Sequence, residues 1–231
     1  SLKAIRYIKL FKKYDLCIDT DPFLNISALA SWYSAKVTLG FSHNQRSKIY
    51  DLTSDFKEQH TLENYKDLLK KLNIENIGTL EKIEVDNNTK LKARFILKKH
   101  NIQDKDFLIG IAPGVGESVK TRMWPLANLA KLADYLTINK NAKVIILDNQ
   151  ENKEDANKLE RLMVHNPINL AGKTSINESI ALIEKCNLFI SNDTGPMHIS
   201  AAQKTKTIGL FGPNTPIRWA PCGENISIYK K

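Results

Sequence analysis

The sequence is poor in cysteine and has no long apolar run, and both shortages limit what the protein can be. Its 231 residues include three cysteines, Cys17, Cys186 and Cys222, and no two of them form a Cys-x-x-Cys pair. Isolated cysteines of this kind favour a reducing cytosolic compartment in which they serve as packing residues. No segment approaches the roughly 20 consecutive apolar residues that span a bilayer. The opening residues lack a signal-peptide pattern, so we expect none.

Three classes of ligand lack their motifs. No Gly-x-Gly-x-x-Gly follows a strand with an acidic residue about 20 positions later, which argues against an NAD dehydrogenase. The formal net charge is +9, yet no nucleic-acid reader motif accompanies it, so we expect no nucleic-acid partner. We also expect no metal. Asp19-Thr20-Asp21 has the Asp-x-Asp form of a metal site, but Pro22 and an apolar helix follow, so capping of that helix by Asp21 or Asn25 is favoured.

Part of the positive charge gathers on an expected opening helix. Apolar residues recur there at helical spacing, which leaves a basic face made of Lys3, Arg6, Lys9, Lys12 and Lys13. A solvated helix face is one interpretation. The other is attraction to an anionic membrane surface or a phosphorylated lipid, to which each nearby lysine contributes about 1 kcal/mol.

The first 102 residues are predicted to form an incomplete α/β domain. Short apolar runs and amphipathic periods indicate strands near 15–19 and 36–40 and helices over 25–34, 61–72 and 86–100. The polar segment 101–106 is the expected boundary with a second domain, 103–231.

The second domain alternates strands and helices with short connections. Strands are expected at 107–111, 143–147, 168–170, 188–190, 206–210 and near Ile226, with helices from Pro125 and over 152–164, 176–185 and 196–203. Ser175 and Glu178 form a capping box that fixes one helix start. Such alternation requires right-handed crossovers and a parallel sheet covered on both faces, so the domain is predicted to be Rossmann-like.

The end of the strand at 188–190 carries the clearest functional signal. Asn192-Asp193-Thr194-Gly195 breaks the strand, and Pro196 stands where the first helical residue favours proline. A helix N-terminus therefore opens above the strand, and its free N–H groups, with about half a positive charge, favour a phosphate. Asp193-Thr194-Gly195 is also the aspartic-protease tripeptide, but no second copy and no all-β setting accompany it. These residues predict a nucleotide-type site.

The same residues carry a family resemblance. Asn192 to His198, then Ala201-Ala202 and Leu210-Phe211-Gly212-Pro213, resemble the carboxyl-terminal signature of the lipopolysaccharide heptosyltransferases, which move heptose from ADP-heptose to the lipid A inner core. The segments 112–114, 122–125 and 169–178 resemble that family's phosphate and nucleotide loops, and 14–19 with 39–41 give a fainter match. The resemblance implies a GT-B-like fold and an inverting glycosyltransferase without a cofactor.

The resemblance also implies roles for residues on the phosphate side. Departure of the diphosphate without a metal needs backbone N–H groups, hydroxyls and cations. Asp193 and Arg122 are the expected catalytic residues, and Arg122 replaces a lysine that is usual in the family. The expected donor-binding residues on this side are Gly114, Gly116, Ser118, Lys120, Thr121, Arg122, Asp193, Thr194, Gly195, Pro196 and His198. For His198, packing inside the helix is the alternative to ligand contact.

The nucleotide side is expected to use two loops. Gly172 and Lys173 follow one strand and are placed to meet the adenine edge, although Lys173 also fits a solvated loop position. Glu151 and Glu154 follow another strand and are placed to meet the ribose hydroxyls. Their position in a first helical turn gives them a second interpretation, in which they offset the helix dipole.

The acceptor half is expected to be incomplete. Members of the resembled family open with a strand and a glycine loop that carries an aspartate acting as general base, and nothing like it precedes Tyr14. Asp19 is only a weak substitute for that base. We therefore expect a fragment with an intact nucleotide half and little or no transfer activity.

The expected function is transfer of heptose from ADP-heptose to the lipopolysaccharide or lipooligosaccharide inner core. Two alternatives stay open: another nucleotide-sugar enzyme of the same architecture, such as an epimerase or a transferase for a different sugar, and a nucleotide-binding fragment without catalysis. The expected partners are a nucleotide sugar and a lipid A core acceptor at an anionic membrane surface. The expected location is the cytoplasm, with peripheral attachment to the inner face of the membrane as an option, and the oligomeric state is not indicated.

Overall fold

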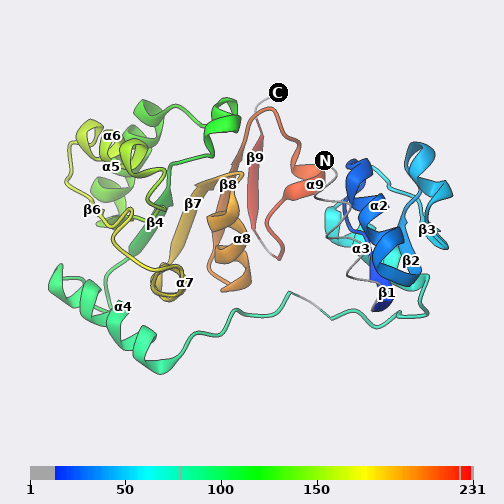
Figure 1. The fold of residues 1–231 in the computed structure, drawn as a ribbon. Helices are drawn as coiled ribbons and strands as arrows, with labels where there is room; N and C mark the ends of the chain where they lie inside the picture. Colours follow the sequence, from blue (N-terminus) through cyan, green and yellow to red (C-terminus); the bar gives the residue numbers. More distant parts are fainter. Residues whose placement is uncertain (1–13, 79, 224, 230–231) are drawn as a thin grey trace. The chain divides into compact units, whose positions relative to one another are not determined.

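The computed structural model describes residues 14–78, 80–223 and 225–229, apart from the side chains of residues 44 and 118. By its internal contacts the chain divides into two compact units, Ser1–Thr79 and Leu80–Lys231 (Figure 1). This division lies before the polar segment at which the sequence placed it. The reason is helix α4 (Asn87–Lys99), whose buried residues Ala93 and Leu97 belong to the core of the second unit. The expected basic helix at the start of the chain lies outside the described residues.

The first unit is a small parallel sheet with helices. Its strands run in the order β1-β2-β3, and a short core of Leu39, Phe41 and Leu68 packs beside them. The elements are β1 (Tyr14–Ile18), α2 (Asn25–Ser34), β2 (Ala35–Phe41), the 3-10 helix η1 (Asn44–Lys48), β3 (Leu52–Ser54) and α3 (Thr61–Lys70). Strand β3 was not predicted, because three residues with one apolar side chain give no periodic signal.

A buried ion pair joins the end of β1 to the segment around η1. The Arg46 side chain is 2% exposed, and its Nη2 lies 2.8 Å from Oδ2 of Asp19. The Tyr50 hydroxyl donates to the same carboxylate oxygen at 2.6 Å, and burial together with this bond raises the pKa of Tyr50 to about 12. Oδ1 of Asp19 accepts the Asp21 N–H. The carboxylate that the sequence offered as a weak substitute base is thus engaged inside its own unit.

Asp21 does not cap α2 as the sequence favoured, because its bonds go to the two residues before the helix, and the N-cap Leu24 receives no side-chain cap. Its carboxylate accepts the N–H groups of Phe23 and Leu24 at 2.6 and 2.7 Å, and these bonds lower the pKa of Asp21. Among the described residues, no three His, Cys, Asp or Glu side chains are grouped closely enough to hold a metal ion.

The second unit contains a six-stranded sheet with all strands parallel. The strand order is β6-β5-β4-β7-β8-β9, which is the order of a doubly wound nucleotide-binding fold. In chain order the strands are β4 (Leu108–Ala112), β5 (Lys143–Ile146), β6 (Ile168–Asn169), β7 (Leu188–Asn192), β8 (Thr207–Phe211) and β9 (Ile226–Tyr229). The order reverses between β4 and β7, so the carboxyl ends of these strands flank the expected ligand crevice.

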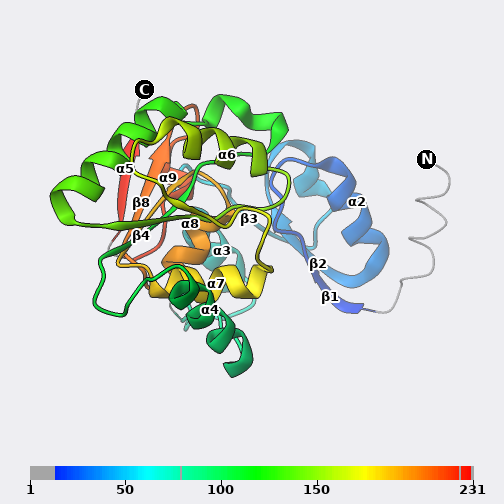
Figure 2. The same cartoon turned by 90° about the vertical axis from the view of Figure 1, so that its left-hand side faces the viewer.

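Helices cover both faces of this sheet (Figure 2). On one face α5 and α6 pack against Ile109, Ile111 and Ile146, and on the other α4, α7 and α8 pack around Leu108, Ile145 and Phe189. The helices are α5 (Leu126–Lys140), α6 (Lys153–Leu162), α7 (Ile176–Lys185), α8 (Gly195–Ala202) and α9 (Pro216–Trp219), with the 3-10 helix η2 (Glu117–Arg122) before α5. The parallel α/β fold predicted from the alternation is therefore confirmed.

Local signals place the helix starts as expected. Ser175 and Glu178 form both bonds of the capping box before α7, and Asp86 caps α4 by accepting the Thr89 N–H at 2.9 Å. Cys186 is buried in the core, as the packing interpretation requires, and burial raises the pKa of its thiol. No helix among the described residues is both long and apolar enough to cross a bilayer.

The buried pair of the first unit should be sensitive to loss of one partner. We expect Arg46→Met to destabilise the first unit by about 3–5 kcal/mol, because the Asp19 carboxylate stays buried without its cation. Hydrogen exchange read by mass spectrometry separates the amides of residues 14–78 from those of the second unit. The double variant Asp19→Asn/Arg46→Met removes both charges and should recover much of the loss. If the double variant is as unstable as the single one, the ion pair is not the cause.

Candidate functional site

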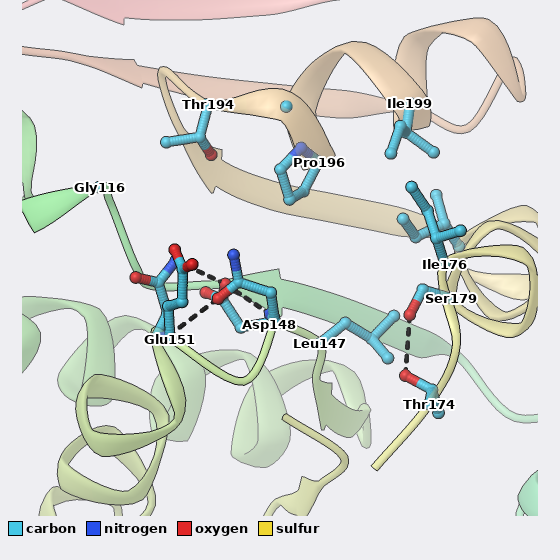
Figure 3. Close-up of a pocket in the computed structure, with 14 residues that line it drawn as sticks. Gly116, Leu147, Asp148, Glu151, Thr174, Ile176, Ser179, Thr194, Pro196 and Ile199 are labelled. Atoms are coloured by element: carbon cyan, nitrogen blue, oxygen red, sulfur yellow. Dashed lines mark hydrogen bonds between the residues drawn. The ribbon is translucent and has the colours of Figure 1, made fainter. Parts of the chain in front are cut away.

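A cavity of about 450 Å³ lies at the carboxyl edge of the second unit's sheet (Figure 3). It is bounded by the loops that follow β4, β5 and β7 and by the starts of α7 and α8. Its lining residues are Gly116, Leu147, Asp148, Asn149, Glu151, Asn152, Thr174, Ile176, Ser179, Ile183, Thr194, Gly195, Pro196 and Ile199.

The cavity has an apolar end and a polar end. Leu147, Ile176, Ile183 and Ile199 form the apolar end, where the hydroxyls of Thr174 and Ser179 lie 2.8 Å apart. The polar end carries Gly116, Asp148 and Glu151 below the start of α8 (Figure 3). An apolar slot with a few polar groups at one side suits a flat ring joined to a hydroxylated and charged group.

The N-terminus of α8 opens onto this cavity. Thr194 is the N-cap residue, but its side chain caps no N–H group of the helix. Gly195 and Pro196 follow and line the cavity. Because the first N–H groups of a helix have no partner within it, this end offers donors and a positive dipole to an anion. The helix start that the sequence predicted is therefore confirmed.

The side-chain amide of Asn192 ties the loop after β4 to β7. Its Nδ2 donates to the Pro113 carbonyl at 2.7 Å, and its Oδ1 accepts the Trp124 N–H at 2.9 Å. Asn192 is 1% exposed, so these buried groups have no water to replace the bonds. One amide thus fixes both ends of the loop 113–124, which carries the cations Lys120 and Arg122.

Asp148 joins the ends of three strands. Its Oδ2 accepts the Gly114 N–H at 2.8 Å, its Oδ1 accepts Nδ2 of Asn152 at 2.8 Å, and its carbonyl accepts the Gly172 N–H at 3.0 Å. Burial outweighs these bonds and raises the pKa of Asp148. Asn152 packs so closely on Gly114 that a Cβ there would lie 2.3 Å from its Cγ. Glycine at position 114 therefore leaves the space that the Asn152 side chain fills.

Asp193 and Arg122, the two expected catalytic residues, face one another. Arg122 Nη1 lies 3.7 Å from Asp193 Oδ2, and Asn214 Nδ2 donates to the same oxygen at 2.7 Å. Asp193 is 6% exposed, while about a third of the Arg122 side chain is exposed. The structure brings the pair together beside the α8 start, and Asn214, which the sequence did not indicate, orients the carboxylate.

The structure places the other expected site residues unevenly around the cavity. Glu151, Gly116, Thr194, Gly195 and Pro196 line it. Lys120 bonds to Asp155 at 2.8 Å and to Glu117 at 3.1 Å, and Lys173 donates to the Asn169 carbonyl. The rest are not among its lining residues, namely Gly114, Thr121, Arg122, Glu154, Gly172, Asp193 and His198. The side chain of Ser118 lies outside the described residues.

The backbone at position 172 has a positive φ that favours glycine. Gly172 has φ +67°, and a Cβ there would lie 2.2 Å from Oε1 of Gln150. This left-handed conformation favours glycine, and the nearby Gln150 side chain leaves no room for a Cβ. Glu154 lies in the first turn of α6, where the helix-dipole interpretation places it.

Sequence reasoning missed the residues that shape the cavity through side-chain contacts. Asp148, Asn149 and Asn152 follow β5, and Ser179 lies on α7. One signal was available for Asp148, because it follows a buried strand as Asp193 does. No local pattern distinguishes Ser179 or Ile199 from ordinary helix residues.

Comparisons with known proteins point to one family. The sequence profile described as glycosyltransferase family 9 (heptosyltransferase) matches residues 6–231. Lipooligosaccharide heptosyltransferase 2 of Campylobacter jejuni is 29% identical over 201 residues, which cover 84% of this chain and 59% of the relative. Curated relatives from two Haemophilus species are matched over only 36% and 43% of their length. The chain thus spans roughly a third to three fifths of these three relatives.

Solved structures show the same fold. A glycosyl transferase family 9 protein from Veillonella parvula superposes with a TM-score of 0.78 at 26% identity, over 99% of this chain and 65% of that one. The E. coli heptosyltransferase WaaC with ADP gives a TM-score of 0.70 at 18% identity, over 100% of this chain and 73% of that one. The GT-B-like fold predicted from the sequence is confirmed.

Asp148 should give stability a pH dependence of recognisable sign. Folding raises the pKa of this carboxyl above the ordinary 3.8, so the folded chain holds the proton more tightly than the unfolded chain does. The free energy of unfolding therefore falls as the pH rises from 3.8 to the pKa of the folded state. Asp148→Asn and Asp148→Ala lack this contribution. We expect the free energy of unfolding of both variants, relative to the wild type, to rise as the pH increases from 3.8. Urea titrations at several pH values measure this slope, and a flat or falling difference would contradict the assignment.

Proposed function

The chain belongs to glycosyltransferase family 9, the heptosyltransferase family, and we propose that its second unit binds ADP-heptose for transfer of heptose to the inner core of lipopolysaccharide or lipooligosaccharide. The observation that carries the proposal is the cavity beneath the N-terminus of α8, with an apolar slot at its other end. The choice of ADP and heptose is supported by the names of the similar proteins, one of which is a heptosyltransferase with ADP.

The chemistry of the two ends orients the nucleotide. The adenine enters the apolar slot between Leu147, Ile176 and Ile199, with the Thr174 and Ser179 hydroxyls at its edge. Asp148 and Glu151 form an acidic wall, which repels phosphate and suits the hydroxyls of the ribose. The diphosphate therefore lies toward Thr194 and Gly195, where the helix dipole favours negative charge.

Transfer requires stabilisation of the departing diphosphate. In the proposed mechanism the free N–H groups of α8 and the guanidinium of Arg122 carry its negative charge, so no metal ion is needed. The forked guanidinium suits two phosphate oxygens at once. Arg122 Nη1 lies 3.7 Å from Asp193 Oδ2, so Asp193 already holds the guanidinium beside the α8 start when the diphosphate binds.

Asp193 is placed to accept hydroxyls of the donor sugar. Its carboxylate lies at the end of β7, directly before the α8 start, and Asn214 fixes one of its oxygens. We do not assign the base that deprotonates the acceptor to Asp19, because Arg46, Tyr50 and the Asp21 N–H already engage its carboxylate. The attack is proposed to invert the configuration at the anomeric carbon.

The acceptor and the location follow as parts of the proposal. An inner-core acceptor attached to lipid A presents its sugars at a membrane surface. The names of two relatives of this chain contain lipooligosaccharide and lipopolysaccharide. We propose that the protein acts at the cytoplasmic side of that membrane.

Binding of ADP in the absence of metal tests the donor half of the proposal. Isothermal calorimetry with ADP, with and without EDTA, should give the same affinity, because helix donors and Arg122 replace a cation. UDP serves as the control and should bind more weakly, since its smaller base fills less of the apolar slot. ADP binding that disappears on chelation would exclude the metal-free site. Transfer from ADP-heptose to heptose-free lipid A core then tests the reaction itself.

Arg122 should contribute to phosphate binding alone. We expect Arg122→Ala to cost about 1.5–3 kcal/mol of ADP affinity through loss of a charge-assisted contact, and to leave adenosine affinity almost unchanged. Lys120→Ala is the matched control, because Lys120 is held by Asp155 and Glu117, and it should affect ADP much less. Equal losses for ADP and adenosine would show that Arg122 acts through local packing.

A further inference from the structure

Helix α4 exposes two large apolar side chains on its outer side. Its inner residues Ala93 and Leu97 are buried in the core that it shares with α7. On the opposite side Leu91 is 60% exposed and Phe95 is 69% exposed. These two residues are four positions apart and therefore adjacent on the helix surface. α4 lies on the outside of α7, away from the sheet (Figure 2).

Cations flank this apolar pair on both sides. At helical spacing Arg94 and Lys98 follow one edge of the pair, and Lys92 and Lys99 follow the other. The helix contains no acidic residue. Within the described part of the chain these four cations form no ion pair, although Lys92 lies near enough to Glu178 to contribute to its lowered pKa. Lys90, at the inner rim, lies 3.7 Å from Glu84.

This arrangement matches the surface of an anionic bilayer. A helix that lies in the plane of a membrane inserts an apolar strip into the headgroup boundary while flanking cations meet the lipid phosphates. Each basic residue near such a surface adds to binding when the lipids are anionic. A nucleic-acid surface, in contrast, would need cations rather than Leu91 and Phe95 at the centre of the contact.

We propose that the α4 face, defined as Leu91, Lys92, Arg94, Phe95, Lys98 and Lys99, docks the protein on an anionic phospholipid bilayer. The proposal concerns a surface outside the nucleotide cavity and does not depend on which sugar is transferred. α4 packs against α7, whose other side carries the cavity residues Ile176, Ser179 and Ile183. Docking through α4 thus leaves one helix between the lipid surface and the cavity.

Helix α5 provides a matched control on the same unit. It lies on the opposite face of the sheet (Figure 2), and it exposes Tyr135 by 60% and Ile138 by 66%. Its apolar pair is comparable in size to that of α4, but Asp134 lies beside it and bonds to the N–H groups of Val164 and His165. A flat bilayer that contacts α4 cannot contact α5 as well.

Sedimentation with vesicles tests the proposal on the full chain. The vesicles are phosphatidylcholine alone or phosphatidylcholine mixed with phosphatidylglycerol, and the wild type should bind only the mixed vesicles strongly. We expect both Leu91→Gln/Phe95→Gln and Arg94→Gln/Lys98→Gln/Lys99→Gln to lower the partition coefficient about tenfold or more. The control Tyr135→Gln/Ile138→Gln should change it less than about twofold.

Three results would overturn the proposal. The α4 variants could bind the mixed vesicles as the wild type does, or the α5 control could lose binding equally. The third result has two parts: Arg94→Gln/Lys98→Gln/Lys99→Gln loses binding to a DNA duplex, and Leu91→Gln/Phe95→Gln keeps vesicle binding. Together they would identify a nucleic-acid surface. Calorimetry with ADP separates this question from the donor site, because the α4 variants should match the wild type there. If neither the wild type nor any of the variants binds ADP, the proposed function is contradicted, while the vesicle result stays valid.

Discussion

The candidate site depends on the two hydrogen bonds that the side-chain amide of Asn192 forms with the loop after β4. Strands β4 and β7 are paired as far as Ala112 and Ser191, but the sheet order reverses between them, and the segments that leave their ends lead to helices on opposite faces of the sheet. Asn192 connects the two strand ends by bonding to both ends of the loop 113–124. Asp148 adds a second connection, from the end of β5 to Gly114 and Gly172. The positions of Arg122 and the cavity wall follow from these two side chains.

The electrostatics of the cavity are divided between its two ends. Among its described lining residues the charged side chains are the acids Asp148 and Glu151, and no lysine or arginine belongs to the lining. Positive potential comes instead from the backbone at the α8 start and from Arg122 beside it. Backbone dipoles are fixed by the fold and need no reorganisation when charge develops. A free lysine side chain would have to reorient. The half-buried carboxylate of Asp148 is partly desolvated, which raises its pKa, and it joins three strand ends.

Charge serves different purposes elsewhere in the chain. In the first unit Arg46 is buried and matched by Asp19, so it stabilises local packing rather than a surface. On α4 the cations Lys92, Arg94, Lys98 and Lys99 stay exposed around two exposed apolar residues and, within the described part of the chain, form no ion pair. The formal net charge of +9 is thus not a uniform property of the surface, and its functional meaning depends on which cations lack acidic neighbours.

The sequence by itself determined the alternation of strands and helices, the helix starts at Asp86, Ser175 and Pro196, and the phosphate-type loop after β7. These features depend on neighbouring residues, so periodicity and capping patterns record them directly. Tertiary structure decided the division between the units, the short strand β3, the roles of Asp148 and Asn192, and the pairing of Arg122 with Asp193. Each of these joins segments distant in the chain, and which strand ends meet is set by sheet order and packing rather than by any local pattern.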